Sequence, residues 1–431
     1  MKTYVYIDNY RGFTEAFIPL KQISFLVGEN STGKTSFLDL IETLSSMTFW
    51  LFEPRYGTPG GAQRHFLDLV SASAKSKKAF SIGAVEVDGN NPEKTFGMFV
   101  TYKSLEGRPV PSRVSVVQGS KVKSLDGKLW RNNKSDKFKS RVKLCTKASA
   151  VVDDDAKLQA LSAIHKSSYG FAELGDSEER APGPLFMRFD DILFEGKGMD
   201  DREFQAPNQL MSNLVELAPI RTKPRRTYDA PQTMFSPEGE HTPYVIRKRL
   251  TNKSQAEAFR RFIESAGQSS GLFKSIAVKQ YGNGPMAPFE MKVILGKSAL
   301  SLENVGYGVS QALPVLVEMF VRPRKTAFTV QQPEVHLHPK AQATFGDQIA
   351  ELARADEKSF LVETHSDFTI DRFRLNLRNH GALPSQLLFF ERTETGNKVT
   401  SIAISDSGEL DSSQPDSYRQ FFYNESLALL S

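Results

Sequence analysis

The segment GENSTGKT, residues 28–35, limits what this chain can fold into more than any other part of its sequence. It matches G-x-x-x-x-G-K-[ST] in full and lies between an apolar run, residues 22–27, and a stretch with helical spacing that begins at Ser36. Glycines let such a loop curl so that its backbone N–H groups and the helix N-terminus meet phosphate oxygens. The lysine adds a positive charge beside the β- and γ-phosphates, and the hydroxyl at the last position can bind Mg²⁺. The segment therefore predicts a phosphate-binding loop between a core strand and a helix.

Length and composition set wide bounds around this loop. At 431 residues, 39% of them hydrophobic, the chain can form one large elaborated domain or two to three smaller ones. A single cysteine, Cys145, excludes an internal disulfide and any multi-cysteine metal site. The first thirty residues do not resemble a signal peptide, and no uncharged apolar run reaches the roughly 20 residues of a membrane span. We therefore expect a cytoplasmic protein with no membrane segment.

Hydrophobic periodicity indicates an α/β fold in which helices are layered on a mixed sheet. The first half of the chain is rich in strand patterns, whereas the last third alternates strands and helices. There is no internal repeat and no sustained heptad pattern, so long coiled-coil arms are not expected. We predict strands at residues 3–8, 14–19, 22–27, 79–103, 113–123, 273–280, 286–296, 326–331, 358–363, 386–392 and 397–404, and helices at 36–50, 154–165, 241–267, 339–355 and from about 309 and 366.

Residues 102–150 contain many more basic than acidic residues, with Trp130 and Phe138 among them. Such a segment can hold a nucleic-acid backbone by charge and stack a base on an aromatic ring. It can equally be a solvated basic hairpin or bind an acidic protein, and these alternatives stay open. The acidic stretch that follows, residues 173–183, is predicted to be a flexible surface loop.

Polar residues follow two of the predicted core strands. In a P-loop fold a second strand presents an acid to the Mg²⁺ shell, and the carboxyl ends of the strands form the edge where ligands bind. We predict that this edge carries Gln331, Gln332 and Glu334 after one strand and His365 after the next. For His365 alone, the alternative is a hydrogen-bonded buried histidine.

A further segment, VGYGVSQALP, residues 305–314, places a G-x-G pattern before a predicted helix. The pattern exposes backbone donors at a helix N-terminus and so predicts a second anion site, although this signal is weak by itself. Pro314 is early enough in the helix to be tolerated, or it kinks the helix.

Two groups of residues have several interpretations. A basic turn can approach nucleotide, nucleic acid or an acidic partner, or it can simply be solvated; its residues are Arg221, Arg225 and Arg226. The spacing of His336 and His338 can bind a metal, although a metal site is the less favoured interpretation.

The motifs GENSTGKTS, VGYGVSQALP, QQPEVHLHPKAQ and VETHSD, in this order, resemble the ABC-type ATPases of the SMC, RecF and OLD lineage. More closely they resemble the compact AAA-annotated ATPases of prokaryotic anti-phage defence operons, of the PARIS and Septu type. The likeness includes LAPIRTKPRRTY, PEGEHTPYVI and QLLFFERTETGNKVTSIAISDSGEL, and covers residues 1–40 and about 210–410. It implies an ABC-type P-loop ATPase head formed by residues 1–54 and 209–431, with a basic, β-rich and helical subdomain inserted at 55–208.

The resemblance implies ATP and Mg²⁺ as cofactors and assigns a role to each motif. The Walker A loop would comprise Gly28, Glu29, Asn30, Ser31, Thr32, Gly33, Lys34, Thr35 and Ser36, with Thr35 also on the metal. The signature segment would comprise Gly306, Tyr307, Gly308, Ser310 and Gln311. The Walker B end would comprise Gln331, also at the metal, and Gln332, with Glu334 nearby and His365 as the switch histidine. In such ATPases two heads close around ATP, which implies a homodimer or higher homo-oligomer with composite sites.

Two departures from the family pattern matter. Gly306 replaces the serine of the transporter-type signature, which weakens a transporter interpretation. The family has Glu-Glu-Pro-Glu or Glu-Gln-Pro-Glu at Walker B, so Gln331 is the unusual residue. Glutamine is nearly isosteric with glutamate but neutral, and it cannot supply the anionic charge that the Mg²⁺ shell or the attacking water uses. Either the natural site is slow or a deliberate Glu→Gln substitution traps bound ATP, and we favour the second.

The resemblance leaves two functions open. In the first, an anti-phage defence ATPase controls a separate effector protein, a nuclease or toxin, through dimerisation of its heads. The compact head favours this function, as does the end of the chain soon after His365, which leaves no room for the fused nuclease domain of OLD enzymes. In the second, a RecF-like DNA-repair ATPase binds DNA through residues 102–150 when ATP is bound.

Overall fold

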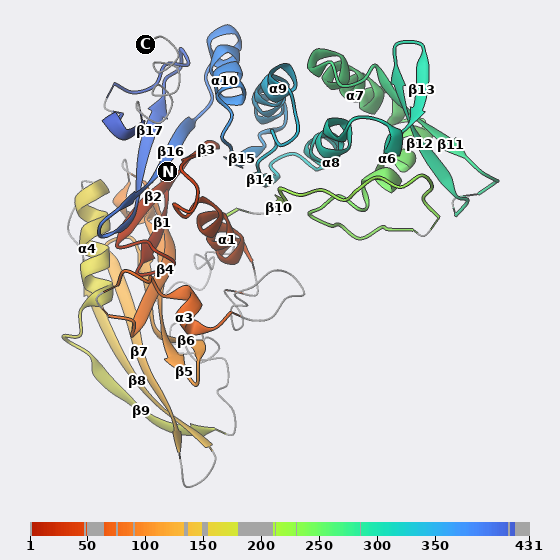
Figure 1. Ribbon diagram of the computed structural model, residues 1–431. Helices are drawn as coiled ribbons and strands as arrows, with labels where there is room; N and C mark the ends of the chain where they lie inside the picture. The colour runs from red at the N-terminus through yellow and green to blue at the C-terminus, as the bar shows by residue number, and fades with distance from the viewer. Residues whose placement is uncertain are drawn as a thin grey trace. The chain divides into compact units, whose positions relative to one another are not determined.

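The computed structural model describes residues 2–46, 49, 64–74, 76–88, 91–132, 137–148, 154–179, 210–211, 213–229, 231–284, 286–412 and 414–418 (Figure 1). The chain divides into two compact units. Unit 1 comprises Met1–Leu20, Glu29–Ser212 and Phe390–Ser401, and unit 2 comprises Lys21–Gly28, Asn213–Phe389 and Ile402–Ser431. The predicted domain boundaries, 54/55 and 208/209, lie outside the described residues.

Unit 1 is built on an eight-stranded sheet in the order β2-β1-β4-β5-β6-β7-β8-β9, in which all neighbouring strands are antiparallel. Helix α4 (Asp154–Lys166) packs on it and contributes Leu158 and Leu161 to a core with Tyr6 and Phe99 (Figure 1). The strands are β1 (Lys2–Asp8), β2 (Ala16–Leu20), β4 (Ala79–Val87), β5 (Phe96–Leu105), β6 (Arg108–Gln118), β7 (Lys121–Asn132), β8 (Lys137–Ala148) and β9 (Ala172–Glu179). Helices α1 (Lys34–Ser45) and α3 (Phe66–Leu69) also belong to this unit.

The basic region of the sequence, residues 102–150, forms the end of β5, strand β6 and the hairpin of β7 and β8, and the acidic stretch after it pairs with β8. Residues 172–179 form strand β9 at the edge of the sheet, so the prediction of a flexible loop over 173–183 is wrong for the part that the structure describes. The register places Lys139 opposite Glu178 and Arg141 opposite Asp176. Polar composition suggested a loop, but an edge strand tolerates polar residues.

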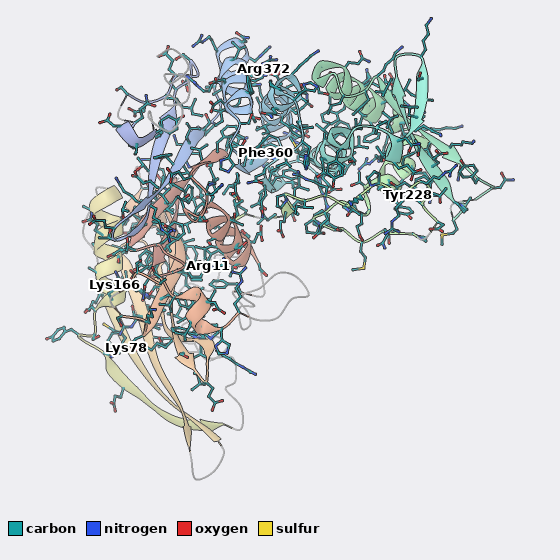
Figure 2. The ribbon with its side chains drawn as sticks, in the orientation of Figure 1. Arg11, Lys78, Lys166, Tyr228, Phe360 and Arg372 are labelled. Atoms are coloured by element: carbon teal, nitrogen blue, oxygen red, sulfur yellow. The ribbon has the colours of Figure 1, made fainter. Side chains whose placement is uncertain are left out.

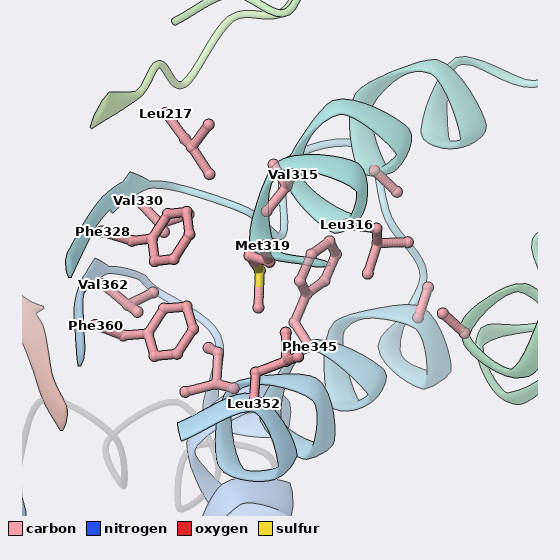
Figure 3. Packing of buried hydrophobic residues seen from close by; sticks show 14 of the residues in the cluster. Leu217, Val315, Leu316, Met319, Phe328, Val330, Phe345, Leu352, Phe360 and Val362 are labelled. Carbon is pink, nitrogen blue, oxygen red and sulfur yellow. The ribbon is translucent and has the colours of Figure 1, made fainter. Parts of the chain in front are cut away.

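Unit 2 contains strands β10, β14, β15 and β3 of a six-stranded sheet with the order β10-β14-β15-β3-β16-β17, together with residues 385–389 of β16 and 402–404 of β17. Strands β10, β14, β15 and β3 run parallel to one another, and β3 and β14 are buried along their whole length. Phe328 and Phe360 stack with ring centroids 5.2 Å apart and face Met319, Phe345 and Leu352 (Figure 3). The strands are β3 (Ile23–Gly28), β10 (Leu214–Leu217), β14 (Ala327–Gln331), β15 (Ser359–Glu363), β16 (Ser385–Thr393) and β17 (Gly396–Ile404).

The helices of unit 2 bury one side of this sheet and support a smaller sheet of three strands. They are α6 (Thr242–Thr251), α7 (Ala256–Ser270), α8 (Tyr307–Val321), α9 (Pro339–Asp356) and α10 (Asp367–His380). The smaller antiparallel sheet consists of β11 (Ser275–Gln280), β12 (Phe289–Leu295) and β13 (Ser298–Ser301). The predicted helix over 241–267 is two helices, because the side chain of Asn252 accepts hydrogen bonds from Ser254 and forms a turn between them. The prediction of an α/β fold with layered helices is confirmed, and no helix among the described residues has the length and apolar character to span a membrane.

Candidate functional site

The predicted phosphate-binding loop follows β3 and ends where α1 begins. Ser31 and Gly33 have φ angles of +63° and +100°, so the loop curls as its sequence predicts. Gly33 is the N-cap of α1 and provides no side-chain cap, which leaves the helix N-terminus open to an external anion. The Lys34 ammonium donates to the carbonyl oxygen of Glu29 at 2.7 Å, and the Thr32 hydroxyl donates to the same oxygen at 2.8 Å. The geometry of this loop fits a bound phosphate group.

Several residues of unit 1 that the sequence did not single out pack around the phosphate-binding loop and the helix after it. A side chain at position 33 would lie 2.7 Å from the Phe13 ring and 2.8 Å from the Asn397 amide nitrogen, so glycine is required there. Arg11 donates to the carboxylate of Asp39 on α1 at 2.5 Å and is labelled in Figure 2. The close approach of residues 13 and 397 involves segments far apart in the sequence, which local patterns cannot reveal.

In unit 2, the ends of β14 and β15 lie side by side, as predicted. Gln331 is paired with Glu363 in the parallel register, and the amide of Gln332 donates to the carbonyl oxygen of Glu363 at 2.8 Å. Gln332 has a φ angle of +44°, so the chain leaves the strand abruptly at this residue. Gln331 is 7% exposed. The register therefore brings the predicted Walker B end next to the segment that contains His365.

Glu334 is half-buried and contacts the segment after β15 directly. One carboxylate oxygen, Oε1, accepts from the backbone amide of His365 at 2.7 Å, while Oε2 is buried without a hydrogen-bond partner. Burial raises the pKa of Glu334 above its usual value, and the hydrogen bond from His365, the other hydrogen bonds of this turn and the charge of Arg221 offset only part of this effect. Glu334 is not in the first turn of α9, which contains no acidic residue. The side chain of His365 is exposed, so it is not the buried histidine that we considered as an alternative.

Arg221, which the sequence placed in a basic turn, is 2% exposed and lies beneath the end of β14. Its guanidinium donates to the carbonyl oxygens of Gln331 and Gln332 at 3.1 and 3.3 Å. Burial lowers the pKa of Arg221 to about 10, and the nearby Glu334 carboxylate counteracts this. Its Nε atom is buried without a hydrogen-bond partner. Arg221 is therefore part of the candidate site, whereas Arg225 and Arg226 are exposed.

The predicted signature segment forms the start of α8. Gly306 is the N-cap, has no side-chain cap and has open space where a side chain would be, so this helix N-terminus is accessible. Gly308 is confined instead, because a side chain there would lie 2.9 Å from the carbonyl oxygen of His336. The Ser310 hydroxyl donates to the carbonyl oxygen of Tyr307 at 2.7 Å. Gln311 is 1% exposed, and its side-chain oxygen accepts from the backbone amide of Arg221 at 3.2 Å.

The two histidines after β14 have structural contacts. The His336 ring packs edge-on against Tyr307 with centroids 4.9 Å apart, and Nδ1 of His338 accepts from the amide of Ala341 at the start of α9. In the described part of the chain, no three His, Cys, Asp or Glu residues form a group that could hold a metal ion. Pro314 lies inside α8, which continues to Val321.

The chain was compared with solved structures, with curated proteins and with protein families. The solved SMC head domain from Thermotoga maritima is 11% identical, with a TM-score of 0.42 over 94% of this chain and 99% of that chain. An Smc head domain with an extended coiled coil, bound to the C-terminal domain of ScpA and derived from Pyrococcus furiosus, is 12% identical, with a TM-score of 0.44 over 93% and 96%. The comparison with curated proteins gave no match.

The comparison with protein families gave a match that covers most of the sequence. The model of the AAA ATPase domain matches residues 1–195 and 236–370. These ranges include the phosphate-binding loop, the start of α8, the ends of β14 and β15, and His365. The chain belongs to the AAA ATPase domain family.

Proposed function

We propose that this protein binds ATP with Mg²⁺ and that paired copies of its ATPase head close around the nucleotide. The observation that carries this proposal is the complete phosphate-binding loop, whose left-handed residues and uncapped helix N-terminus fit a polyphosphate. Membership of the AAA ATPase domain family supports the same function. Gly28 to Ser36 bind the phosphates through their backbone amides, Lys34 supplies a positive charge, and Thr35 holds the metal through its hydroxyl.

The residues of unit 2 have proposed roles in hydrolysis. Bound Mg²⁺ would neutralise developing charge on the phosphate oxygens. In this proposal Gln331 would face the metal, and Gln332, Glu334 and His365 would orient water and contact the γ-phosphate. A glutamine at 331 can hold water by hydrogen bonds but cannot accept its proton, because the amide is not basic. We therefore propose that this sequence binds ATP well and hydrolyses it slowly.

The start of α8 has a proposed role in pairing two copies of the chain. Its uncapped N-terminus, with open space at Gly306, fits an anion brought by a second copy. In this arrangement Gly306, Tyr307, Gly308, Ser310 and Gln311 form the signature side of a composite ATP site. A homodimer is the smallest assembly with two such sites.

The partner that we propose is a separate effector protein in prokaryotic anti-phage defence, a nuclease or toxin that the head dimer holds or releases. The RecF-like alternative uses the basic residues 102–150 to bind DNA. The sequence of β9, which pairs with β8, is acidic and lowers the net charge of this part of the chain, so it does not favour this alternative. Salt-sensitive, ATP-stimulated binding to duplex DNA would favour the RecF-like alternative.

A paired experiment tests the proposal. ATP binding and ATP turnover are measured for this chain, for Lys34→Ala and for Gln331→Glu, with oligomeric state followed by light scattering. We expect this chain to bind ATP and dimerise with little turnover, Lys34→Ala to lose binding, and Gln331→Glu to gain turnover by about 100-fold, the size of effect typical of a single catalytic group. If restoring the acid leaves turnover unchanged while Lys34→Ala abolishes binding, the assignment of Gln331 to the catalytic position is wrong.

A further inference from the structure

Arg221 connects two parts of unit 2 that are distant in sequence. Its side chain donates to the carbonyl oxygens of Gln331 and Gln332 at the end of β14. Its backbone amide donates to the side chain of Gln311 on α8 at 3.2 Å, and its carbonyl oxygen accepts from the same side chain at 3.5 Å. We call this set of contacts between Arg221, Gln311 and the two strand-end carbonyls the Arg221 clasp.

The chemistry of the clasp requires arginine. A planar guanidinium can donate in parallel to two carbonyl oxygens that diverge at a strand end, whereas the ammonium of lysine is a point donor. The site is dry, because Arg221 is 2% exposed, so these bonds are stronger than they would be in water. Burial lowers the pKa of Arg221 only to about 10, so the side chain remains charged near neutral pH.

The clasp also contains groups whose hydrogen-bonding capacity is not used. Nε of Arg221 and Oε2 of Glu334 are both buried and make no hydrogen bond. The two side chains are close enough for the charge of Glu334 to act on Arg221. Buried polar atoms without a hydrogen-bond partner are exceptional in folded proteins and are found where a ligand, a water or a rearrangement supplies the partner.

We propose that Arg221 is a positioning residue that couples α8 to the end of β14, so that a shift at the start of α8 changes the orientation of Gln331. This inference rests on the proposed function, in which the start of α8 contacts nucleotide bound by another copy. A shift of α8 moves Gln311, which holds the backbone of Arg221. The guanidinium then moves the peptide groups of Gln331 and Gln332. The clasp makes the geometry at position 331 depend on whether a second head has closed.

Hydrogen exchange measured by mass spectrometry tests the clasp without relying on turnover. The variant is Arg221→Lys, and the matched control is Arg225→Lys, the same change at an exposed position four residues along the same segment. In nucleotide-free protein, we expect Arg221→Lys to raise exchange about 10-fold or more in peptides covering residues 307–311 and 331–337, since charge-assisted bonds are lost. Peptides covering β12, residues 289–295, should be unchanged, and the control should match the unaltered protein throughout.

A second variant removes the side chain on α8 that bonds to Arg221. Gln311→Ala should raise exchange at residues 331–337, although the side chain of Gln311 bonds to the backbone of Arg221 and not to its guanidinium. With ATP added, the unaltered protein should show protection in both peptides together, and either variant should protect 307–311 while 331–337 no longer responds.

The outcomes separate the two proposals. Unchanged exchange at 331–337 in both variants overturns the clasp, and so does a uniform rise throughout unit 2 with a lowered Tm, which indicates only a structural role. Failure of the unaltered protein to bind ATP overturns the proposed function and with it the nucleotide-dependent use of the clasp. The nucleotide-free measurement distinguishes these cases, because it reports on the contacts whether or not ATP binds.

Discussion

Two carboxylates in unit 2, the buried Glu318 and the half-buried Glu334, differ in how completely their oxygens are paired. Glu318 on α8 uses both oxygens: Oε1 bonds to Nε2 of His241 at 2.8 Å and Oε2 accepts from Nε of Arg322 at 2.6 Å. Burial alone would raise its pKa, but the bonds to His241 and Arg322 outweigh burial and lower it. Glu334 uses one oxygen, and burial raises its pKa.

The difference indicates what each cluster is for. A buried polar group with all its partners present holds two segments in one arrangement, here the segment before α6 and the body of α8. A buried polar group that lacks a partner destabilises the fold, and such groups concentrate where a ligand, water or second conformation provides the partner. The comparison therefore predicts a structural role for the Glu318 cluster and a functional role for the Glu334 cluster.

The largest expected effect is from Glu318→Ala. Removing this carboxylate leaves the buried His241 and the partly buried Arg322 without their partner, so we expect a loss of about 3–5 kcal/mol in the free energy of unfolding. Urea denaturation followed by far-ultraviolet circular dichroism measures it. A loss below about 1 kcal/mol would mean that the paired cluster does not hold the unit together, and the comparison would fail.

A smaller effect is expected from Glu334→Gln. The amide oxygen can keep the bond from His365 while the buried charge disappears, so the free energy of unfolding should change by less than about 1 kcal/mol in either direction. The matched control, Glu318→Gln, loses charge-assisted bonds and should cost about 1.5–3 kcal/mol in the same urea experiment. Equal losses for the two glutamine variants would erase the distinction between the clusters.

The smallest expected effect is on the pH dependence of stability. The contributions of Glu318 and Glu334 to the free energy of unfolding should change in opposite directions as the pH rises. The contribution of Glu318, whose pKa is lowered, is present above the usual value of 4.5 and is lost as the pH falls through the lowered pKa. Glu334 has a raised pKa, so the native state binds its proton more tightly, and the stabilisation present below 4.5 is lost as the pH rises through the raised pKa. Urea midpoints of the unaltered protein and of the two glutamine variants, measured from about pH 2 to 8, give each contribution by difference. Contributions of the same sign would contradict the assignment of these shifts.

Local patterns in the sequence were sufficient for much of the fold and for part of the site. The predicted strand at 326–331 and helix at 339–355 agree with β14 and α9 to within one residue, because apolar period and the proline at a helix start are local signals. Strand β9 could not be predicted, because its residues become a strand only through their pairing with β8. The burial of Arg221 was equally inaccessible, since its partners at 311, 331 and 332 lie about a hundred residues further along the chain. The roles of the individual site residues remain predictions.

The two glycines at the start of α8, Gly306 and Gly308, are under different steric constraints. A side chain at position 308 would collide with the chain at His336, whereas position 306 has nothing within reach. Descendants that lost the use of nucleotide would therefore still need glycine at 308 to keep the fold, but would be free to drift at 306. Among relatives of this chain, substitution at 306 with glycine retained at 308 should mark lineages in which the head persists as a scaffold after its chemistry has gone.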